Sequence, residues 1–150
     1  MKMYKIEDVK EFMGLLFLKE IFDKFCVGSM ELKTLVPISI KGTLMADWLS
    51  EEDKETYGNC EYVPWHLLRP VAFSLIKGKQ TPQLLRINFV HYMENGDCGG
   101  LRVQYEKNEL ICISSYTPAN FSLDKSREQV WDDKCSEFLT KNQIVSTQLQ

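Results

Sequence analysis

Acidic residues are absent from a long central stretch of this chain. Between Glu61 and Glu94 the sequence has no aspartate or glutamate, although the 150-residue chain carries a net charge of -3. The stretch 62–93 is therefore locally cationic, and it follows an acidic segment, 47–61. Either the two segments dock on each other, which we favour, or the cationic one is free to bind an anionic partner.

Histidine is scarce and cysteine is scattered. The chain has two histidines and five cysteines, without any Cys-x-x-Cys pair. Because structural zinc sites and disulfide frameworks need closely spaced or paired residues, we expect no metal, no cofactor and reduced thiols. Reduced thiols are typical of the cytoplasm, which is the location we predict. The cysteines are Cys26, Cys60, Cys98, Cys112 and Cys135.

Long apolar runs are also missing. No run approaches the roughly 18 residues that a membrane-spanning helix needs. Glu7 and Asp8 stand where a secretion signal would have its apolar region, so we expect neither membrane insertion nor export. With 44% apolar residues, the chain suits one domain with a real core. We place that domain at 1–143 and a fraying polar tail at 144–150.

Segments with helical periodicity alternate with segments of period two. Helices at both ends of the chain, around clustered strands, indicate a single α+β domain. We expect an antiparallel sheet of about five strands packed against three to four helices. The helical segments lie near 6–17, 44–57, 64–76 and 124–142, and the strands near 30–40, 85–92, 101–105, 110–114 and 119–123.

Pro70 interrupts the third helical segment. Its ring removes a backbone donor and disfavours helical geometry at the preceding residue. Two alternatives remain open: a turn over 64–68 precedes a helix that starts at Pro70, or one helix from Pro64 is kinked there. In both cases Gly78 ends the element.

Two side chains near the start of this segment share one face if it is helical. His66 and Arg69 are three residues apart, and Trp65 is adjacent. Such a face suits a small anion or a nucleic-acid base. The simpler interpretation, which we favour, is a core tryptophan with His66 and Arg69 at the surface or paired with 47–61. The ligand-binding candidates of the cationic stretch are Trp65, His66, Arg69, Lys77, Lys79 and Arg86.

His91 lies on the apolar face of its predicted strand, beside Ile87 and Phe89. A histidine in that position is usually a packed residue, so we assign no catalytic residue. An enzyme that uses His66 or His91 with a cysteine or carboxylate from elsewhere is the second alternative. It requires a deep pocket and a second polar group within hydrogen-bond reach of one imidazole.

Several short motifs resemble those of a known family. Over nearly the whole chain, the sequence is similar to a family of short clostridial-type bacterial proteins that is catalogued as a domain of unknown function. The resemblance implies a bacterial, cytosolic, single-domain protein, and it implies no activity, cofactor or catalytic residue. The motifs are Leu68-Arg69-Pro70, then Ile76-Lys77-Gly78-Lys79 followed by Thr81-Pro82, and Phe121-Ser122-Leu123-Asp124-Lys125-Ser126 with Trp131-Asp132.

These features favour a non-enzymatic interaction or regulatory module. It would associate with a protein partner, or with a second copy of itself, through a sheet edge or an apolar face. The first alternative is binding of nucleic acid or another anionic ligand through 62–93. Salt dependence separates the two, because binding through charge weakens as the ionic strength rises.

Overall fold

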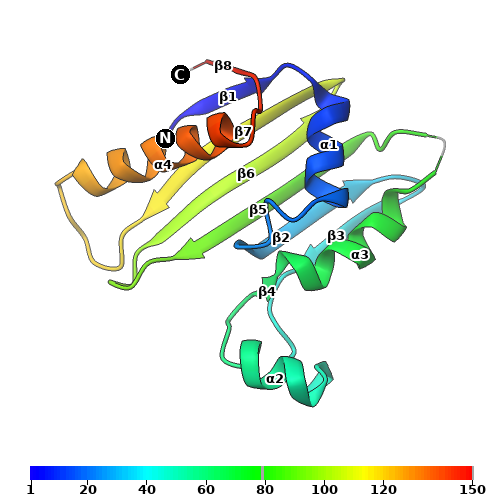
Figure 1. The fold of residues 1–150 in the computed structure, drawn as a ribbon, viewed down its shortest axis with the longest axis horizontal. Coiled ribbons are helices and arrows are strands. Elements are labelled where there is room, and N and C mark those ends of the chain that lie inside the picture. Colours follow the sequence, from blue (N-terminus) through cyan, green and yellow to red (C-terminus); the bar gives the residue numbers. More distant parts are fainter. Residues whose placement is uncertain (79, 150) are drawn as a thin grey trace.

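The computed structural model describes residues 1–78 and 80–149, which form an α+β fold around one large antiparallel sheet (Figure 1). These ranges contain eight strands, four α-helices and one short 3-10 helix, η1. The strands are β1 (Met3–Ile6), β2 (Cys26–Lys33), β3 (Pro37–Lys41), β4 (Val63–Pro64), β5 (Leu84–Tyr92), β6 (Cys98–Glu106), β7 (Glu109–Thr117) and β8 (Ser146–Gln148). The helices are α1 (Val9–Leu18), η1 (Ala46–Trp48), α2 (Glu51–Tyr57), α3 (Trp65–Ile76) and α4 (Ser126–Lys141).

The sheet has the strand order β3-β2-β5-β6-β7-β1-β8, and β4 pairs with β2 beside this path. All of these pairings are antiparallel, which confirms the predicted α+β fold with an antiparallel sheet. The prediction of about five strands is wrong. The sequence pattern missed β1, β4 and β8, which have four, two and three residues. Strands that short contain too few residues for a period-two pattern to be recognised.

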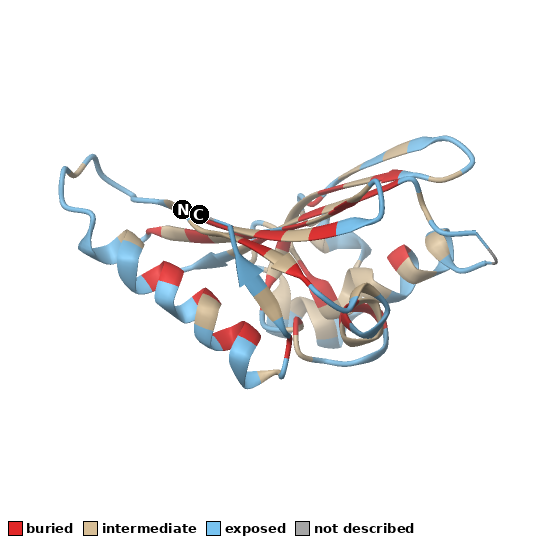
Figure 2. Cartoon of the chain, turned by 90° about the horizontal axis from the view of Figure 1, so that it is seen from above, coloured by how far each residue is buried: buried red, intermediate tan, exposed pale blue. Residues whose placement is uncertain are grey.

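Helices α1, α3 and α4 lie against one side of the sheet and leave the other side open (Figures 1 and 2). Along β5, Leu85, Ile87 and Phe89 are fully buried on the helix side, as the period-two pattern predicts. Each Å² of apolar surface that this arrangement removes from water contributes about 25 cal/mol to stability. Aromatic rings contribute much of the core, among them Phe12, Phe22, Phe25, Trp65, Phe89 and Phe138.

The open side of the sheet is polar and ordered. Arg86 donates to Glu31 on β2 and to Gln104 on β6, each at 3.1 Å. Arg102 donates to Asn88 across the same pair of central strands at 2.8 Å. One apolar face and one solvated face are typical of an antiparallel sheet with helices on a single side.

Two helices can be compared with the boundaries predicted for them. Helix α3 continues through Pro70 as one element, so the alternative of a single helix holds. The hydroxyl of Ser50 accepts the backbone N–H of Asp53 at 3.2 Å and caps α2. The segment 44–57, predicted as helical with an ambiguous start, contains η1 before this cap and α2 after it.

Two further segments differ from expectation. Residues 119–123 lie in the loop between β7 and α4, not in a strand. The Asp97 carboxylate accepts the Ala119 N–H at 2.8 Å and so ties this loop to the turn between β5 and β6. Where we predicted a fraying tail from residue 144, Ile144 is buried and β8 pairs with β1. Within the described ranges no helix is long and apolar enough to cross a membrane.

Candidate functional site

The predicted site residues on α3 face different surroundings. Trp65 is completely buried, and its indole N–H donates to the carbonyl of Leu16 at 3.1 Å. His66 is half-buried, and its ring lies 5.0 Å from that of Tyr57, centre to centre. The interpretation of Trp65 as a core residue is therefore confirmed.

The two arginines of the cationic stretch lie on opposite sides of the sheet. Arg69, on α3, pairs with Asp23 at 2.8 Å. Arg86 pairs with Glu31 at 3.1 Å on the open side. Each charge is thus matched locally by an acid that lies outside the acidic segment 47–61.

The remaining residues of the stretch 62–93 show which groups contact the acidic segment 47–61. Lys77 is exposed at the C-cap of α3, and Lys79 lies outside the described residues. The hydroxyl of Tyr92 donates to Glu61 at 2.9 Å. The two segments therefore touch through aromatic and hydroxyl groups, and the five predicted residues that the structure describes are not gathered into one site. A ligand-binding role for each of them stays a prediction.

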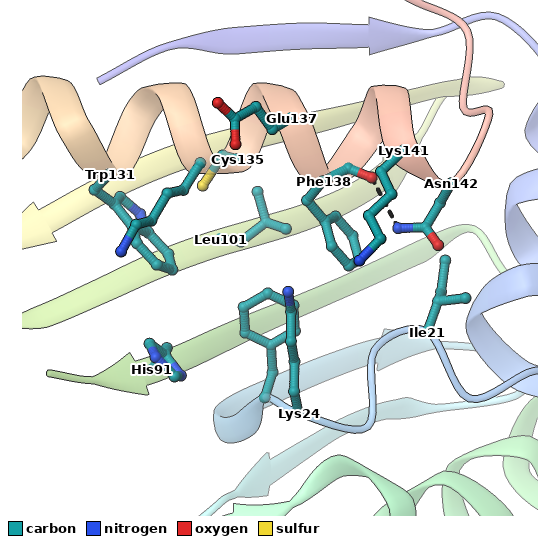
Figure 3. Close-up of a pocket in the computed structure, with 12 residues that line it drawn as sticks. Ile21, Lys24, His91, Leu101, Trp131, Cys135, Glu137, Phe138, Lys141 and Asn142 are labelled. Carbon is teal, nitrogen blue, oxygen red and sulfur yellow. Dashed lines mark hydrogen bonds between the residues drawn. The ribbon is translucent and has the colours of Figure 1, made fainter.

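A groove of about 550 Å³ lies between α4 and the turn that precedes β2 (Figure 3). We call it the α4 groove. This volume lies within the range of about 300–1,000 Å³ that is usual for small-molecule sites. Its floor is formed by Phe25, Leu101, Trp131, Cys135 and Phe138, and its rim by Lys24, His91, Lys134, Glu137 and Lys141.

Three lysines line the rim: Lys24 comes from the turn before β2, and Lys134 and Lys141 come from α4. In Figure 3 the amines of Lys24 and Lys141 point into the groove from opposite walls, whereas the Glu137 carboxylate lies toward the far edge of α4. The Lys24 amine lies 4.7 Å from the centre of the Phe138 ring. Partial burial and the neighbouring charge of Lys141 lower the pKa of Lys24. Among the described residues no carboxylate pairs with Lys24, Lys134 or Lys141, so the rim has an excess of positive charge.

His91 completes the cationic rim at the end of β5. Its ring is nearly parallel to that of Trp131, with centres 5.9 Å apart and planes that differ by 7°. Partial burial, followed by the charges of Lys24 and Lys134, holds the pKa of His91 below its ordinary value. The imidazole is therefore neutral at pH 7, and its protonation adds a further positive charge to the groove.

The α4 wall of the groove is fixed to the sheet by polar contacts and close packing. The Trp131 indole N–H donates to the carbonyl of Gly100 at 3.0 Å. The hydroxyl of Ser114 donates to Asp132 at 2.6 Å. At Gly99, a Cβ atom would lie 2.5 Å from the Trp131 ring, so the indole packs directly on the bare backbone of β6. These contacts give the groove a rigid side, which favours a preformed site.

The two histidines make aromatic contacts, and the thiol of Cys135 is held in its protonated form. The His91 ring contacts Trp131 and the His66 ring contacts Tyr57, and among the described residues neither ring has a hydrogen-bonded side-chain partner. Burial raises the pKa of the Cys135 thiol to about 12, which leaves it unreactive near neutral pH.

Sequence reasoning missed the α4 groove as a site. His91 was placed on the correct face of β5, and Lys134 lies in the predicted helical segment 124–142, but neither observation indicates a cationic cluster. The lysines Lys24 and Lys141 stand far apart in the sequence, and only the packing of α4 brings them together. The acid-free stretch contributes a single member, His91.

The chain is an α+β protein with an antiparallel sheet, helices on one side of it and a lysine-rimmed groove beside the last helix. The chain belongs to the family described as Family of unknown function (DUF5721), whose model matches residues 15–98 and 97–146. The membership that the motifs predicted is thereby confirmed, while an origin in clostridial-type bacteria stays a prediction. Neither the search of curated proteins nor the search of solved structures gave a match.

Proposed function

We propose that this protein is a non-enzymatic binding module that holds an organic anion in the α4 groove. The observation that carries the proposal is the convergence of Lys24, Lys134 and Lys141, without acid partners among the described residues, above an aromatic floor. A bacterial, cytoplasmic protein with an interaction or regulatory role belongs to the same proposal, supported by the family resemblance and by the scattered cysteines.

The electrostatics of the groove favour an anion over a neutral or cationic ligand. Lys24 and Lys141 approach each other closely enough that the second lowers the pKa of the first. An anion placed between the two amines replaces this repulsion by two attractions. The contacts are partly shielded from water, so each of them is stronger than an ion pair at an open surface.

The floor adds a preference for a ligand with an apolar body. Phe25, Trp131 and Phe138 present aromatic groups beneath the lysines, and apolar atoms of a ligand gain about 25 cal/mol per Å² when they cover such a surface. A small inorganic ion would leave this surface wet. An aromatic or alicyclic anion therefore fits better than free phosphate.

Removal of one rim charge should weaken binding of an anionic aromatic probe. We expect anilinonaphthalene sulfonate to bind Lys24→Gln and Lys141→Gln about three- to tenfold more weakly than the unchanged protein, since one charge-assisted contact is lost in each. Its fluorescence in a titration at low salt measures the dissociation constant. The affinity should also fall as the salt concentration rises toward about 300 mM.

The matched control for these variants is Lys10→Gln, which removes an exposed lysine of α1 away from the groove. It should bind the probe like the unchanged protein. Far-ultraviolet circular dichroism checks that all variants are folded, because the probe also binds partly unfolded chains. Equal affinity of the two groove variants and the control would remove the basis of the proposal.

The pH dependence of probe binding should report His91. Because the pKa of His91 is lowered from its ordinary value, the ring is neutral at pH 7.5 and gains its proton only on the acid side of that value. The proton adds a positive charge, so we expect the affinity to rise about two- to fivefold between pH 7.5 and 5. The sulfonate stays ionised over this range, and titrations at several pH values measure the change.

His91→Gln separates this effect from other titrations. The charged side chains that line the two hollows with His91 are Lys24, Lys134, Lys141, Glu137 and Glu61. If His91 is responsible, the rise in affinity is absent in His91→Gln. An unchanged rise in that variant would assign the effect to another group.

A further inference from the structure

A second hollow, of about 420 Å³, adjoins the α4 groove. Lys24 and His91 line both of them, so the two volumes meet along these side chains. The far end of the second hollow lies between the start of β2, the end of β5 and the residues before β4. These two side chains therefore stand between the hollows, and a ligand that occupies both hollows lies across them.

The second hollow offers a stacking surface for a planar group. The rings of Tyr62 and Tyr92 are parallel to within 3°, with centres 6.4 Å apart. Tyr92 is 47% exposed, so the pair is open to a further ring. Aromatic side chains beside a cationic patch are the usual means by which proteins hold nucleobases.

Polar groups in the same hollow suit the edge of a base. The Tyr92 hydroxyl donates to one carboxylate oxygen of Glu61, Oε2, at 2.9 Å, and this leaves Oε1 for another donor. The side-chain amide of Asn59 lines the same hollow. A carboxylate accepts hydrogen bonds from exocyclic amino groups such as N4 of cytosine, and it opposes the carbonyl oxygen that uracil presents at the same position.

We infer that the ligand is a nucleoside phosphate with an amino-bearing base, its phosphate among Lys24, Lys134 and Lys141 and its base beside Tyr62, Tyr92 and Glu61. The inference rests on the proposed function, since it requires an anion in the α4 groove. It explains why a cationic rim and an aromatic pair with an open carboxylate adjoin each other. An acyl chain would fit the second hollow less well, because it would remove Glu61 and Asn59 from water without a hydrogen bond.

The test compares four compounds on the full-length chain by isothermal titration calorimetry at low salt. Cytidine monophosphate should bind about tenfold more tightly than ribose 5-phosphate, which lacks a base, because one stacked base contributes about that factor. Uridine monophosphate should bind more weakly than cytidine monophosphate. Cytidine lacks the phosphate. It should show no measurable binding at concentrations at which cytidine monophosphate saturates the protein.

Two exposed glutamates provide a matched pair of variants. Glu61→Gln should remove the preference for cytidine over uridine monophosphate, whereas Glu94→Gln, in the turn after β5, should keep it. Loss of the preference in both variants, or in neither, would overturn the assignment of Glu61.

The outcomes separate this inference from the proposed function. Equal binding of ribose 5-phosphate and cytidine monophosphate, together with weaker probe binding by Lys141→Gln, would keep the anion site and overturn the nucleoside phosphate. Failure of every anion to bind would overturn both the nucleoside phosphate inference and the proposed function. Binding of a single-stranded oligonucleotide in strong preference to the mononucleotide would also overturn the inference, in favour of a nucleic-acid surface.

Discussion

Replacement of Gly99 by alanine is expected to lower the free energy of unfolding by about 1–3 kcal/mol, the usual cost of forcing an extra methyl group into a packed core. The new Cβ would lie 2.5–2.7 Å from three atoms of the Trp131 ring, closer than such atoms normally approach. Gly99 is not among the glycines with positive φ, so the effect arises from the contact and not from the backbone. Urea unfolding measures it through the midpoint concentration.

Gly14→Ala is the control for this experiment. Gly14 lies within α1, where nothing stands within 4 Å of the added Cβ. Because alanine favours a helix over glycine, we expect the free energy of unfolding to rise by up to about 1 kcal/mol. A Gly99→Ala protein as stable as the unchanged chain would show that Trp131 does not occupy this position.

Replacement of Trp65 by alanine should have the largest effect of any single change considered, a loss of about 3–5 kcal/mol. Trp65 is completely buried, and its ring contacts those of Phe17 and Phe89, with centres 5.8 and 5.4 Å away. Its indole N–H satisfies the carbonyl of Leu16, which lies in the last turn of α1 and has no partner within the helix. The side chain thus joins α1, α3 and the sheet.

Trp65→Phe separates the loss of apolar contact from the loss of the hydrogen bond to Leu16. Phenylalanine keeps most of the apolar contact and leaves the Leu16 carbonyl without its donor, so we expect a smaller loss of about 1–3 kcal/mol. Trp48→Ala, at a position that is 91% exposed, should change the stability by no more than about 0.5 kcal/mol. Thermal unfolding followed by circular dichroism would compare the three proteins. Equal losses for Trp65→Ala and Trp48→Ala would contradict the buried position.

The parts of the fold that sequence reasoning predicted are those with a long repeat of one period. Leu85, Ile87 and Phe89 alternate over a nine-residue strand, and Trp131, Cys135 and Phe138 follow helical spacing over about two turns of α4. The strands β1, β4 and β8 are too short for a period-two pattern to be recognised in the sequence. They form by pairing with strands that lie far away in the chain. Local pattern contains no information about such partners.

The candidate site was less predictable for a related reason. The acid-free stretch directed attention to Arg69 and Arg86, which the fold neutralises with Asp23 and Glu31 from other elements. The cations that lack acid partners among the described residues, Lys24 and Lys141, stand in sequence beside Asp23 and close to Glu137, where they look compensated. Charge balance along a sequence therefore did not report charge balance in space.

The position of β1 in the sheet carries a cost in chain entropy. A five-residue turn, 93–97, joins the paired residues Tyr92 and Cys98, whereas the pair of Lys5 with Ile111 closes a loop of more than one hundred residues. Closing the longer loop costs about 3 kcal/mol more, since the closure term grows with the logarithm of loop length. The hairpins of β5, β6 and β7 therefore close at a small entropic cost. The pairing of β1 has a larger closure cost, which the burial of Tyr4 and Ile6 offsets.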